Sequence, residues 1–377
     1  MEALCARDNT QQNRPAMRKL FLTLLATLSF VFSMAQDHDR RVVIIMLDGL
    51  RWQELFDGAD TAYVNNRKYA VNPEGIGKLY VRDTQEERRM ALMPFTWGFV
   101  RQHGTIIGNR RQNSLMSVSN QYHFSYPGYS EILCGVADDA RITSNDEIPN
   151  PNISVLEAAN RDPRYQGRVM AFASWGTVAY ILNMSHSGLP VVAGQYSKTT
   201  AHTPSEREAF LDGMKADMVD MWGDATLDLI TYHYAAEAMR TLKPKVLYVG
   251  FNETDEFGHH GRYDHYLMAA NHNDDFIGRL WKQAQDDPFY RDKTTFIVTT
   301  DHGRGSGDQW VDHGRQAPGS EYTWFMAFGN GIKPLGETAG NGPFYSKQIA
   351  MTVARLLGIG FTPTGGVKPE PIPVIEE

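Results

Sequence analysis

Runs of consecutive apolar residues, each ended by a turn or a polar pair, constrain this chain more than any other feature. The first run is Val-Val-Ile-Ile-Met-Leu at residues 42–47, and it stops at Asp48-Gly49. A run of this kind is typical of a strand buried on both faces, and such strands occur mainly in parallel sheets. Four similar runs lie at residues 169–173, 246–251, 296–300 and 324–328.

Helical patterns separate these runs, and the clearest lie at residues 204–218, 227–242, 263–285 and 346–357. Strands that alternate with helices predict an α/β fold with a mostly parallel central sheet sandwiched by helices, as well as cap or insertion loops. Ligands of such a fold bind beyond the carboxyl ends of its strands. We expect residues 61–77 and 331–343 to be surface loops or insertions. Residues 36–377 contain no evident linker and should form a single domain.

The first 35 residues have the pattern of a leader. Within residues 17–35, the positive pair Arg18-Lys19 precedes an apolar run that ends at Phe32, and small residues stand before Gln36. This pattern is typical of a secretory signal peptide, and the run is shorter than the roughly 20 residues that span a bilayer. We therefore expect an exported protein, periplasmic or extracellular, with no membrane span after cleavage. An uncleaved anchor or a buried first helix is the alternative.

The composition narrows the classes of function. Of 377 residues, 42% are hydrophobic, which excludes a disordered or fibrous chain. The formal net charge of −7 argues against binding to a nucleic-acid duplex. It does not exclude an anionic substrate, because bound metal ions can reverse the local field. The only cysteines, Cys5 and Cys134, make neither a disulfide framework nor a cysteine metal site, so His, Asp and Glu must hold any metal.

Acidic residues and histidines follow three of the predicted strands. Because the carboxyl ends of parallel strands meet at one edge of a sheet, these side chains should converge there. Three carboxylates and three imidazoles form a ligand set suited to two zinc ions, which can clamp both oxygens of a phosphoryl transfer. The six candidate ligands are Asp48, Asp255, His259, Asp301, His302 and His313.

A candidate nucleophile stands before a helical pattern that begins near residue 125. Ser125 is followed by Pro127 and Gly128, which suit the first turn of a helix, so the serine should lie at the helix N-terminus. Free N–H groups there favour an anionic group, and a zinc ion bound to the hydroxyl would lower its pKa. The alternative is that Ser125 is only an N-cap.

Together these motifs, in this order, resemble the alkaline phosphatase superfamily, and most closely its type I phosphodiesterase/nucleotide pyrophosphatase branch. The resemblance covers the chain from Val42 to about Gly314. The matching pieces are Leu47-Asp48-Gly49, Ser125-x-Pro127, Asp255-x-x-Gly258-His259, Thr300-Asp301-His302-Gly303 and His313-Gly314.

The resemblance implies two zinc sites and a covalent mechanism. One zinc ion, on the side of the leaving group, would be held by Asp255, His259 and His313. The other, which would also bind the Ser125 oxygen, would be held by Asp48, Asp301 and His302. Ser125 would attack a phosphate ester of a small molecule, glycan or nucleotide, and water would hydrolyse the phosphoseryl intermediate. Asn145 would donate a hydrogen bond to a phosphate oxygen.

The sequence departs from the branch beside the nucleophile. The branch usually has Thr-Phe-Pro-Asn where this chain has Ser125-Tyr126-Pro127-Gly128. The resemblance therefore does not determine the substrate pocket near the missing Asn. The preference between monoesters and diesters is open too. Nearby residues that would bind a monoester dianion are Arg110, Arg111 and Arg141, and aromatic residues that would stack on a base or sugar are Trp97, Trp175 and Tyr180.

Three other functions compete with this interpretation. A sulfatase shares the fold, but Gly128 and Tyr129 occupy the last two places of the formylglycine motif and remove its signal. A cofactor-independent phosphoglycerate mutase is cytosolic and needs a large inserted domain. The predicted signal peptide and the compact spacing between residues 125 and 255 argue against it. A secreted binding protein with a degenerate site would be favoured by loss of any one of the six candidate ligands, and all six are present.

Overall fold

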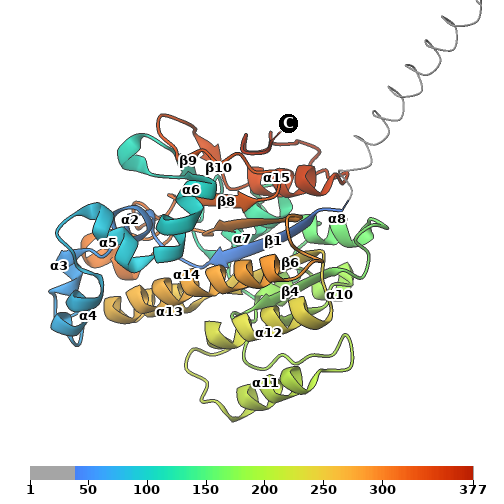
Figure 1. Ribbon diagram of the computed structural model, residues 1–377, viewed down its shortest axis with the longest axis horizontal. Helices are drawn as coiled ribbons and strands as arrows, with labels where there is room; N and C mark the ends of the chain where they lie inside the picture. Colours follow the sequence, from blue (N-terminus) through green and yellow to red (C-terminus); the bar gives the residue numbers. More distant parts are fainter. Residues whose placement is uncertain (1–38, 377) are drawn as a thin grey trace, which may run out of the picture. The chain divides into compact units, whose positions relative to one another are not determined.

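The computed structural model describes residues 39–376, so the predicted signal peptide at 17–35 lies outside the described residues. The centre of the fold is an eight-stranded sheet in the order β5-β4-β6-β1-β7-β8-β2-β9 (Figure 1). These strands are β1 (Arg41–Leu47), β2 (Gly104–Ile107), β4 (Val169–Ala173), β5 (Val191–Ala193), β6 (Val246–Phe251), β7 (Thr294–Thr299), β8 (Phe325–Gly329) and β9 (Gly336–Glu337). Only β8 runs antiparallel to its neighbours, so the predicted mostly parallel sheet is confirmed.

The central strand β1 explains the continuous apolar run at residues 42–47. Its even-numbered residues from Val42 to Met46 belong to one buried apolar cluster, and its odd-numbered residues from Val43 to Leu47 belong to another. Side chains alternate along a strand, so burial of both faces leaves no position for a polar residue. Asp48, the first polar residue after the run, therefore stands where the strand leaves the sheet.

Helices cover both faces of the sheet, as predicted. Residues of α12 (Asp228–Thr241) and α14 (Tyr263–Asp286) share the apolar cluster of Val43, whereas α7 (Ser125–Cys134), α8 (Val155–Arg161) and α15 (Gln348–Leu357) share that of Val42. The predicted helix at 204–218 is α11 (Glu206–Asp217). It begins with a capping box, in which Ser205 and Glu208 accept each other's backbone N–H groups.

The segment between β1 and β2 corrects one expectation. Residues 61–77, expected as a loop, contain α3 (Thr61–Val64) and most of α4 (Pro73–Tyr80). Each helix begins at a polar cap: Asp60 accepts a hydrogen bond from the N–H of Ala62, and Asn72 accepts one from the N–H of Gly75. Asn, Pro and Gly suit helix ends as well as loops, so composition alone did not separate the two.

The remaining described elements are short. They are α2 (Trp52–Asp57), α5 (Gln85–Leu92), η1 (Thr96–Val100), α6 (Arg101–His103), η2 (Arg110–Gln112), β3 (Met116–Ser117), α9 (Val178–Ile181), α10 (Met184–Ser187), α13 (Glu253–His259), η3 (Gly307–Val311) and β10 (Phe344–Tyr345). No helix in the part of the chain that the structure describes is long and apolar enough to cross a membrane.

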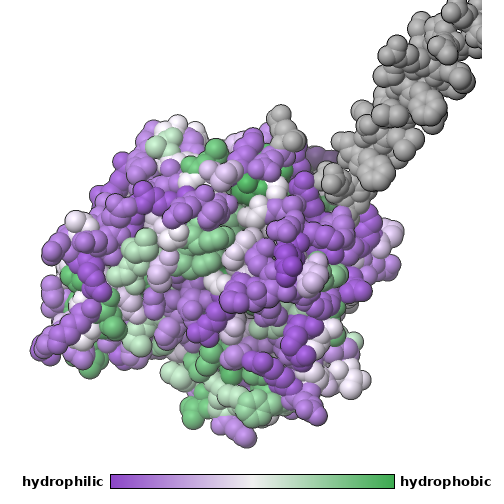
Figure 2. All heavy atoms as spheres, viewed as in Figure 1, coloured by the Kyte–Doolittle hydropathy of each residue, from purple (hydrophilic) through white to green (hydrophobic). Residues whose placement is uncertain are grey.

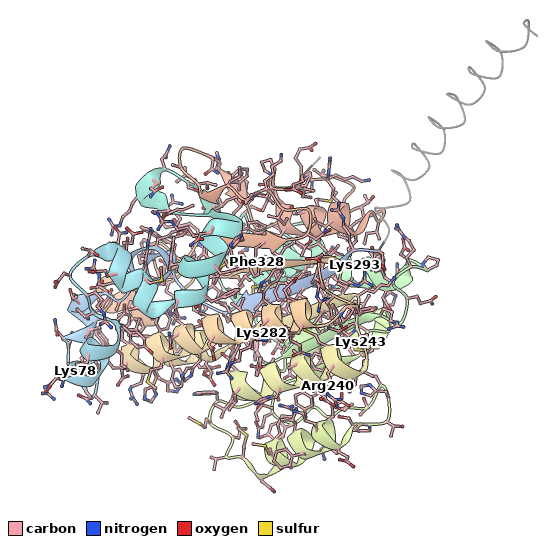
Figure 3. The ribbon with its side chains drawn as sticks, in the orientation of Figure 1. Lys78, Arg240, Lys243, Lys282, Lys293 and Phe328 are labelled. Atoms are coloured by element: carbon pink, nitrogen blue, oxygen red, sulfur yellow. The ribbon has the colours of Figure 1, made fainter. Side chains whose placement is uncertain are left out.

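Polar residues dominate the face of the molecule that Figure 2 shows, with an apolar area over α11. In α11, Phe210 has an exposed fraction of 66%. By contrast Phe328 of β8 is fully buried, and Lys282 points into solvent (Figure 3). This distribution is that of a chain with a large internal core.

Candidate metal and nucleophile site

Three neighbouring parallel strands bring the candidate ligands to one edge of the sheet. β1 lies between β6 and β7, and its last residues pair with Phe251 and Thr299. Asp48 directly follows β1, Asp255 lies in α13 just after β6, and Asp301 follows β7. The predicted convergence at the carboxyl edge is therefore present in the fold.

Asp48, Asp301 and His302 form the more deeply buried part of this site, which we call the inner group. His302 Nε2 lies 3.4 Å from Asp48 Oδ1 and 3.2 Å from Asp301 Oδ2. Apart from these contacts with His302, neither of the two buried carboxylate oxygens has a hydrogen-bond partner in the described residues. Uncompensated buried oxygens are costly, so this arrangement fits a cation bound between them.

Hydrogen bonds on the far side of each inner-group residue fix its orientation. The Tyr129 hydroxyl donates to Asp48 Oδ2 over 2.8 Å, and the N–H of Gly49 donates to Asp301 Oδ1 over 3.1 Å. His302 Nδ1 lies 2.8 Å from the carbonyl oxygen of Gly303, to which it donates as N–H. Nε2 therefore faces the carboxylates and is the ring nitrogen that a metal-binding histidine would offer.

Burial and neighbouring charges shift the pKa of each inner-group residue. Burial raises the pKa of Asp301 well above its usual range, and the neighbouring Asp48 raises it further. Burial and the charge of Asp255 also raise the pKa of Asp48. Burial alone would lower the pKa of His302, but Asp301 and Asp48 outweigh it and raise that pKa to about 9. A bound cation would relieve the repulsion between the carboxylates.

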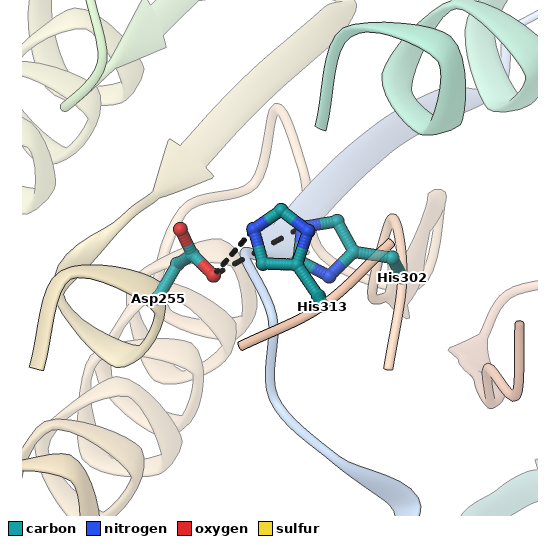
Figure 4. A group of neighbouring side chains, drawn as sticks. All are labelled: Asp255, His302 and His313. Atoms are coloured by element: carbon teal, nitrogen blue, oxygen red, sulfur yellow. Dashed lines mark ion pairs between the residues drawn. The ribbon is translucent and has the colours of Figure 1, made fainter. Parts of the chain in front are cut away.

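Asp255, His259 and His313 lie beside it and form the outer group. His259 Nε2 is 3.2 Å from Asp255 Oδ2 and 2.9 Å from His313 Nε2. His313 Nε2 is 3.7 Å from Asp255 Oδ1, and His302 is 3.9 Å from the same oxygen, so His302 stands between the two groups (Figure 4). Ligand atoms of Asp255, His302 and His313 all lie within 4.8 Å of one another. The chain thus offers two adjacent sets of metal-binding atoms.

Arg304 supports the outer group, and no sequence pattern predicted this role. Its buried guanidinium forms an ion pair with Asp255 and donates to the carbonyl oxygens of Trp310 and Val311 over 2.9 and 2.7 Å. Burial would raise the pKa of Asp255, but Arg304 and the two neighbouring histidines lower it well below its usual range. Arg304 therefore links the Asp255 carboxylate to the segment that leads to His313.

The candidate nucleophile stands at the first position of α7. Ser125 is buried, and its Oγ lies 3.2 Å from His302 Nε2. The helix can approach this closely because residue 128 is glycine: a Cβ there would lie 2.5 Å from the carbonyl oxygen of Asp301. No side chain caps the N-terminus of α7, so Ser125 is not an N-cap. In the first turn the N–H of Tyr126 donates to Asn145, the N–H of Gly128 donates to the carbonyl oxygen of Phe124, and Pro127 has none, so among the described contacts the N–H of Ser125 is the one left without an acceptor.

Asn145 lies next to the same helix end. Its Oδ1 accepts a hydrogen bond from the N–H of Tyr126 over 2.9 Å, and its side chain is exposed. The loop that leads into α7 is also held tightly: Asn120 accepts from the N–H of His123, and Glu131 accepts from the N–H of Asn120. The nucleophile position is thus set by the fold on both sides.

The three arginines proposed as phosphate ligands have other contacts. Arg111 is paired with Asp57 and Arg141 with Asp138, and both side chains are largely exposed. Arg110 stacks on the ring of Tyr322 at 3.5 Å.

Of the three aromatic candidates, Trp97 is a core residue, whereas Trp175 packs edge-on against Tyr129. Tyr180 lines a cavity at the carboxyl edge of the sheet.

Comparisons with known proteins agree with the motifs. Residues 155–325 match the family model of type I phosphodiesterase/nucleotide pyrophosphatase. No curated protein matches the sequence of the chain. The wild-type alkaline phosphatase PafA has a similar structure, with a TM-score of 0.59, 13% identity and coverage of 89% of this chain and 99% of PafA.

Two further solved structures are similar. Murine ectonucleotide pyrophosphatase/phosphodiesterase 5, an inactive variant in complex with AMP, gives a TM-score of 0.53, 12% identity and coverage of 87% of this chain and 97% of its own. A putative sulfatase from Bacteroides thetaiotaomicron gives a TM-score of 0.55 and 12% identity, with coverage of 88% of this chain and 74% of its own. At such identities these likenesses show the fold. The resemblance of this chain to the alkaline phosphatase superfamily, with its type I phosphodiesterase/nucleotide pyrophosphatase branch, is confirmed.

Proposed function

We propose that this chain is a two-zinc hydrolase of phosphate esters with Ser125 as its nucleophile. The observation that carries the proposal is the position of Ser125 Oγ, 3.2 Å from His302 Nε2, at a buried helix N-terminus beside unpartnered carboxylate oxygens. Family and fold support hydrolysis of phosphate or sulfate esters. The metals, the covalent step and the ester are the parts that we propose.

The ligand atoms fit zinc in number and kind. The inner group would hold one ion, together with the Ser125 oxygen, and the outer group would hold the other. Nitrogen and oxygen donors of this type suit zinc, and the buried oxygens of Asp48 and Asp301 require a positive partner. When bound, such ions polarise ester oxygens and lower the pKa of water.

The residues of the chain bind, orient and attack the substrate. Ser125 Oγ bonds to phosphorus as the bond to the leaving alkoxide breaks, and water then cleaves the phosphoseryl bond and regenerates the hydroxyl. The N–H of Ser125, at the N-terminus of α7, and the amide nitrogen of Asn145 would donate to the non-bridging oxygens. The close contact of Gly128 with Asp301 keeps the nucleophile aligned.

A phosphate ester is favoured over a sulfate ester by the residues after Pro127. Gly128 faces the backbone of Asp301 with no room for a side chain, and the hydroxyl of Tyr129 is bonded to Asp48. Residues 128 and 129, the last two positions of the formylglycine motif, therefore make other contacts in this chain. Presence of all six candidate ligands likewise argues against a binding protein with a degenerate site.

Hydrolysis assays of the zinc-loaded protein test the function. We expect turnover of p-nitrophenyl phosphate or its bis-p-nitrophenyl diester, and the preferred ester decides between monoesterase and diesterase activity. Turnover of p-nitrophenyl sulfate alone would overturn the proposal. Ser125→Ala should lose at least about 1,000-fold in kcat while retaining two zinc ions per chain. Ser130→Ala, in the same helix but bonded to Asn150, is the matched control and should remain active.

The proposed location is periplasmic or extracellular, and it rests on the pattern at residues 17–35. Expression of the full chain in a bacterium, followed by mass spectrometry of the exported protein, should identify Gln36 as the first residue. A chain that stays in the cytoplasm with residues 17–35 attached would contradict it.

A further inference from the structure

The short helix α13 carries two of the three outer-group ligands, and another helix caps its N-terminus. Asp255 and His259 lie in α13, whose N-cap residue Asn252 makes no side-chain hydrogen bond to the first turn. The carboxylate of Asp228, in α12, accepts instead: Oδ1 accepts the N–H of Asn252 over 2.8 Å, and Oδ2 accepts the N–H of Glu253 over 3.2 Å. Buried N–H groups at a helix N-terminus need acceptors, so Asp228 supplies what α13 lacks.

The two helices exchange caps. Leu227, the N-cap residue of α12, has no polar side chain, and Glu253 Oε1 accepts the N–H of Asp228 over 3.0 Å. Each carboxylate thus lies at the N-terminus of the other helix, where the helix dipole favours a negative charge. Because Asp228 is the first residue of α12 and Glu253 is the first of α13, neither helix can shift along the other without breaking these hydrogen bonds.

Asp228 is itself fixed to the central sheet. It is completely buried, and Ser174, the residue after β4, donates its hydroxyl to Asp228 Oδ1 over 2.7 Å. The backbone of Ser174 is bonded on both sides: its N–H donates to the carbonyl oxygen of Gly250 in β6, and its carbonyl oxygen accepts the N–H of Thr226. A continuous series of hydrogen bonds therefore leads from β4 and β6 through Asp228 to the first turn of α13.

Two further contacts hold α13, and both involve its side chains rather than its backbone. The Thr254 hydroxyl donates to the carbonyl oxygen of Asp48 over 2.5 Å, and Arg304 forms its ion pair with the Asp255 carboxylate. Among residues 39–376, no side chain other than Asp228 accepts a backbone N–H group at the start of α13. The path of the helix backbone therefore depends on Asp228 in a way that the other two contacts cannot replace.

We infer that Asp228 is a positioning residue for the outer group: it holds α13 where Asp255 and His259 meet His313. The ligand atoms are close, with His259 Nε2 3.2 Å from Asp255 Oδ2 and 2.9 Å from His313 Nε2. Zinc tolerates only small deviations from its bond lengths, so a displaced helix would bind it weakly. The inference rests on the proposed function, because it assumes that the outer group holds a zinc ion.

Zinc titration of the full chain against a chromogenic chelator measures the affinities of both ions. Asp228→Ala removes the acceptor for Asn252 and Glu253, so it should weaken the outer ion by about 10–100-fold and leave the inner ion within about twofold. Asp228→Asn has the same size and keeps one acceptor oxygen, so it should fold even where alanine does not, and it should weaken the outer ion by roughly 3–10-fold. An equal loss at both ions, or an unchanged affinity ratio, would overturn the inference.

Asp274 provides the matched control. It is equally buried and likewise accepts two backbone N–H groups and one hydroxyl, those of Phe95 and Thr96, but η1, which it caps, carries no candidate ligand. Asp274→Asn should lower the free energy of unfolding about as much as Asp228→Asn, while the ratio of the two zinc affinities stays unchanged. The same change of ratio in both variants would reflect a general loss of stability and would contradict a specific role of Asp228.

Hydrogen exchange of the metal-free protein separates positioning from charge. Asp228→Asn should speed exchange of the α13 amides by about fivefold to tenfold relative to those of α14, because α13 loses part of its cap. A weaker outer ion with unchanged exchange in α13 would mean that Asp228 acts only through its charge, and would refute the assignment.

The same measurements separate this inference from the proposed function. If the wild-type chain binds no zinc but exchange in α13 responds to Asp228→Asn as expected, the proposed function fails and the role of Asp228 in fixing α13 stands. If two zinc ions bind and phosphate esters are hydrolysed, but Asp228→Asn leaves the affinity ratio unchanged, the inference about Asp228 fails alone.

Discussion

The inner and outer groups of the site are built differently. Asp48, Asp301 and His302 follow the ends of central strands and are completely buried, so the backbone of the sheet fixes them. The outer group comes from a short helix, α13, and from the segment after η3, and the side chain of His259 is 38% exposed. The sheet therefore preorganises the inner group, whereas the outer group depends on contacts between side chains of separate segments.

Arg304 connects the separate segments of the outer group. It places a positive charge beside the Asp255 carboxylate and donates to the carbonyl oxygens of Trp310 and Val311 at the same time. In the inner group the corresponding cation is the imidazole of His302, whose pKa the neighbouring carboxylates raise to about 9. We therefore expect the two groups to respond differently to mutation, pH and metal removal.

The largest effect should follow removal of an inner carboxylate. Asp301→Asn should abolish binding of one zinc ion and lower kcat/KM by about 1,000-fold or more, because several kcal/mol of charge stabilisation are lost. The same change should stabilise the metal-free protein, since it removes the repulsion with Asp48. Zinc analysis and thermal unfolding in a chelator measure both. Asp274→Asn, equally buried but bonded to Thr96, should keep both ions.

Stability of the metal-free protein should fall between pH 6.5 and 9. The folded pKa of His302 is raised to about 9, so its contribution is complete below the unfolded value of about 6.5 and disappears as pH rises through 9. The raised pKa of Asp301 acts in the same direction. We expect a loss of roughly 2–3 kcal/mol in urea unfolding, and a much smaller one with zinc bound. Equal slopes with and without zinc would show that zinc leaves His302 free.

Loss of the Arg304 support should weaken the outer position alone. Arg304→Gln should reduce zinc affinity there by about 10–100-fold, since the carboxylate and the segment before His313 lose their common partner. Arg304→Lys should recover only part of it, because lysine cannot reproduce the planar set of donors. Competitive titration with a chromogenic chelator distinguishes the two ions. Tighter binding in Arg304→Gln would mean that the arginine mainly competes with the metal.

Arg51 provides the control for this experiment. It is equally buried and donates to the carbonyl oxygen of Gly305 on the same segment, but its ion pair is with Glu54. Arg51→Gln should therefore lower stability without changing the ratio of the two zinc affinities.

The smallest effect should come from the hydroxyl behind the inner group. Tyr129→Phe removes the hydrogen bond to Asp48 Oδ2 and should lower kcat/KM by about tenfold with zinc content unchanged. Tyr165→Phe, which removes a buried hydroxyl bonded to the carbonyl of Leu357, should leave kcat/KM unchanged. No difference between the two variants would mean that the sheet alone orients Asp48.

The sequence predicted those strands and helices whose burial is visible in a short run of neighbouring residues. The run at 42–47 identified β1 because both of its faces are buried, and the strand ends then indicated where Asp48 and Asp301 would meet. The three-residue β5 and the four-residue β2 are too short for such a signal. The helices α3 and α4 were not predicted, because the polar residues that cap them are also common in loops.

The residues that sequence reasoning missed depend on distant partners. Arg304 follows a recognisable motif, but nothing local distinguishes a buried arginine that binds Asp255 from a surface one. Local pattern can suggest which side chains carry chemistry, whereas the fold alone shows which side chains hold them in place.

The order in which the central strand finds its partners has a consequence for synthesis of the chain. Val42 pairs with Val246, and Arg41 pairs with Thr294. The ribosome must therefore add roughly 200 to 250 residues after β1 before its partner strands β6 and β7 exist. Closing such long loops makes the sheet slow to form and leaves its first strand without native partners during most of translation. Such a chain stays unfolded until it is nearly complete. An unfolded polypeptide is the form that can pass through a narrow export channel.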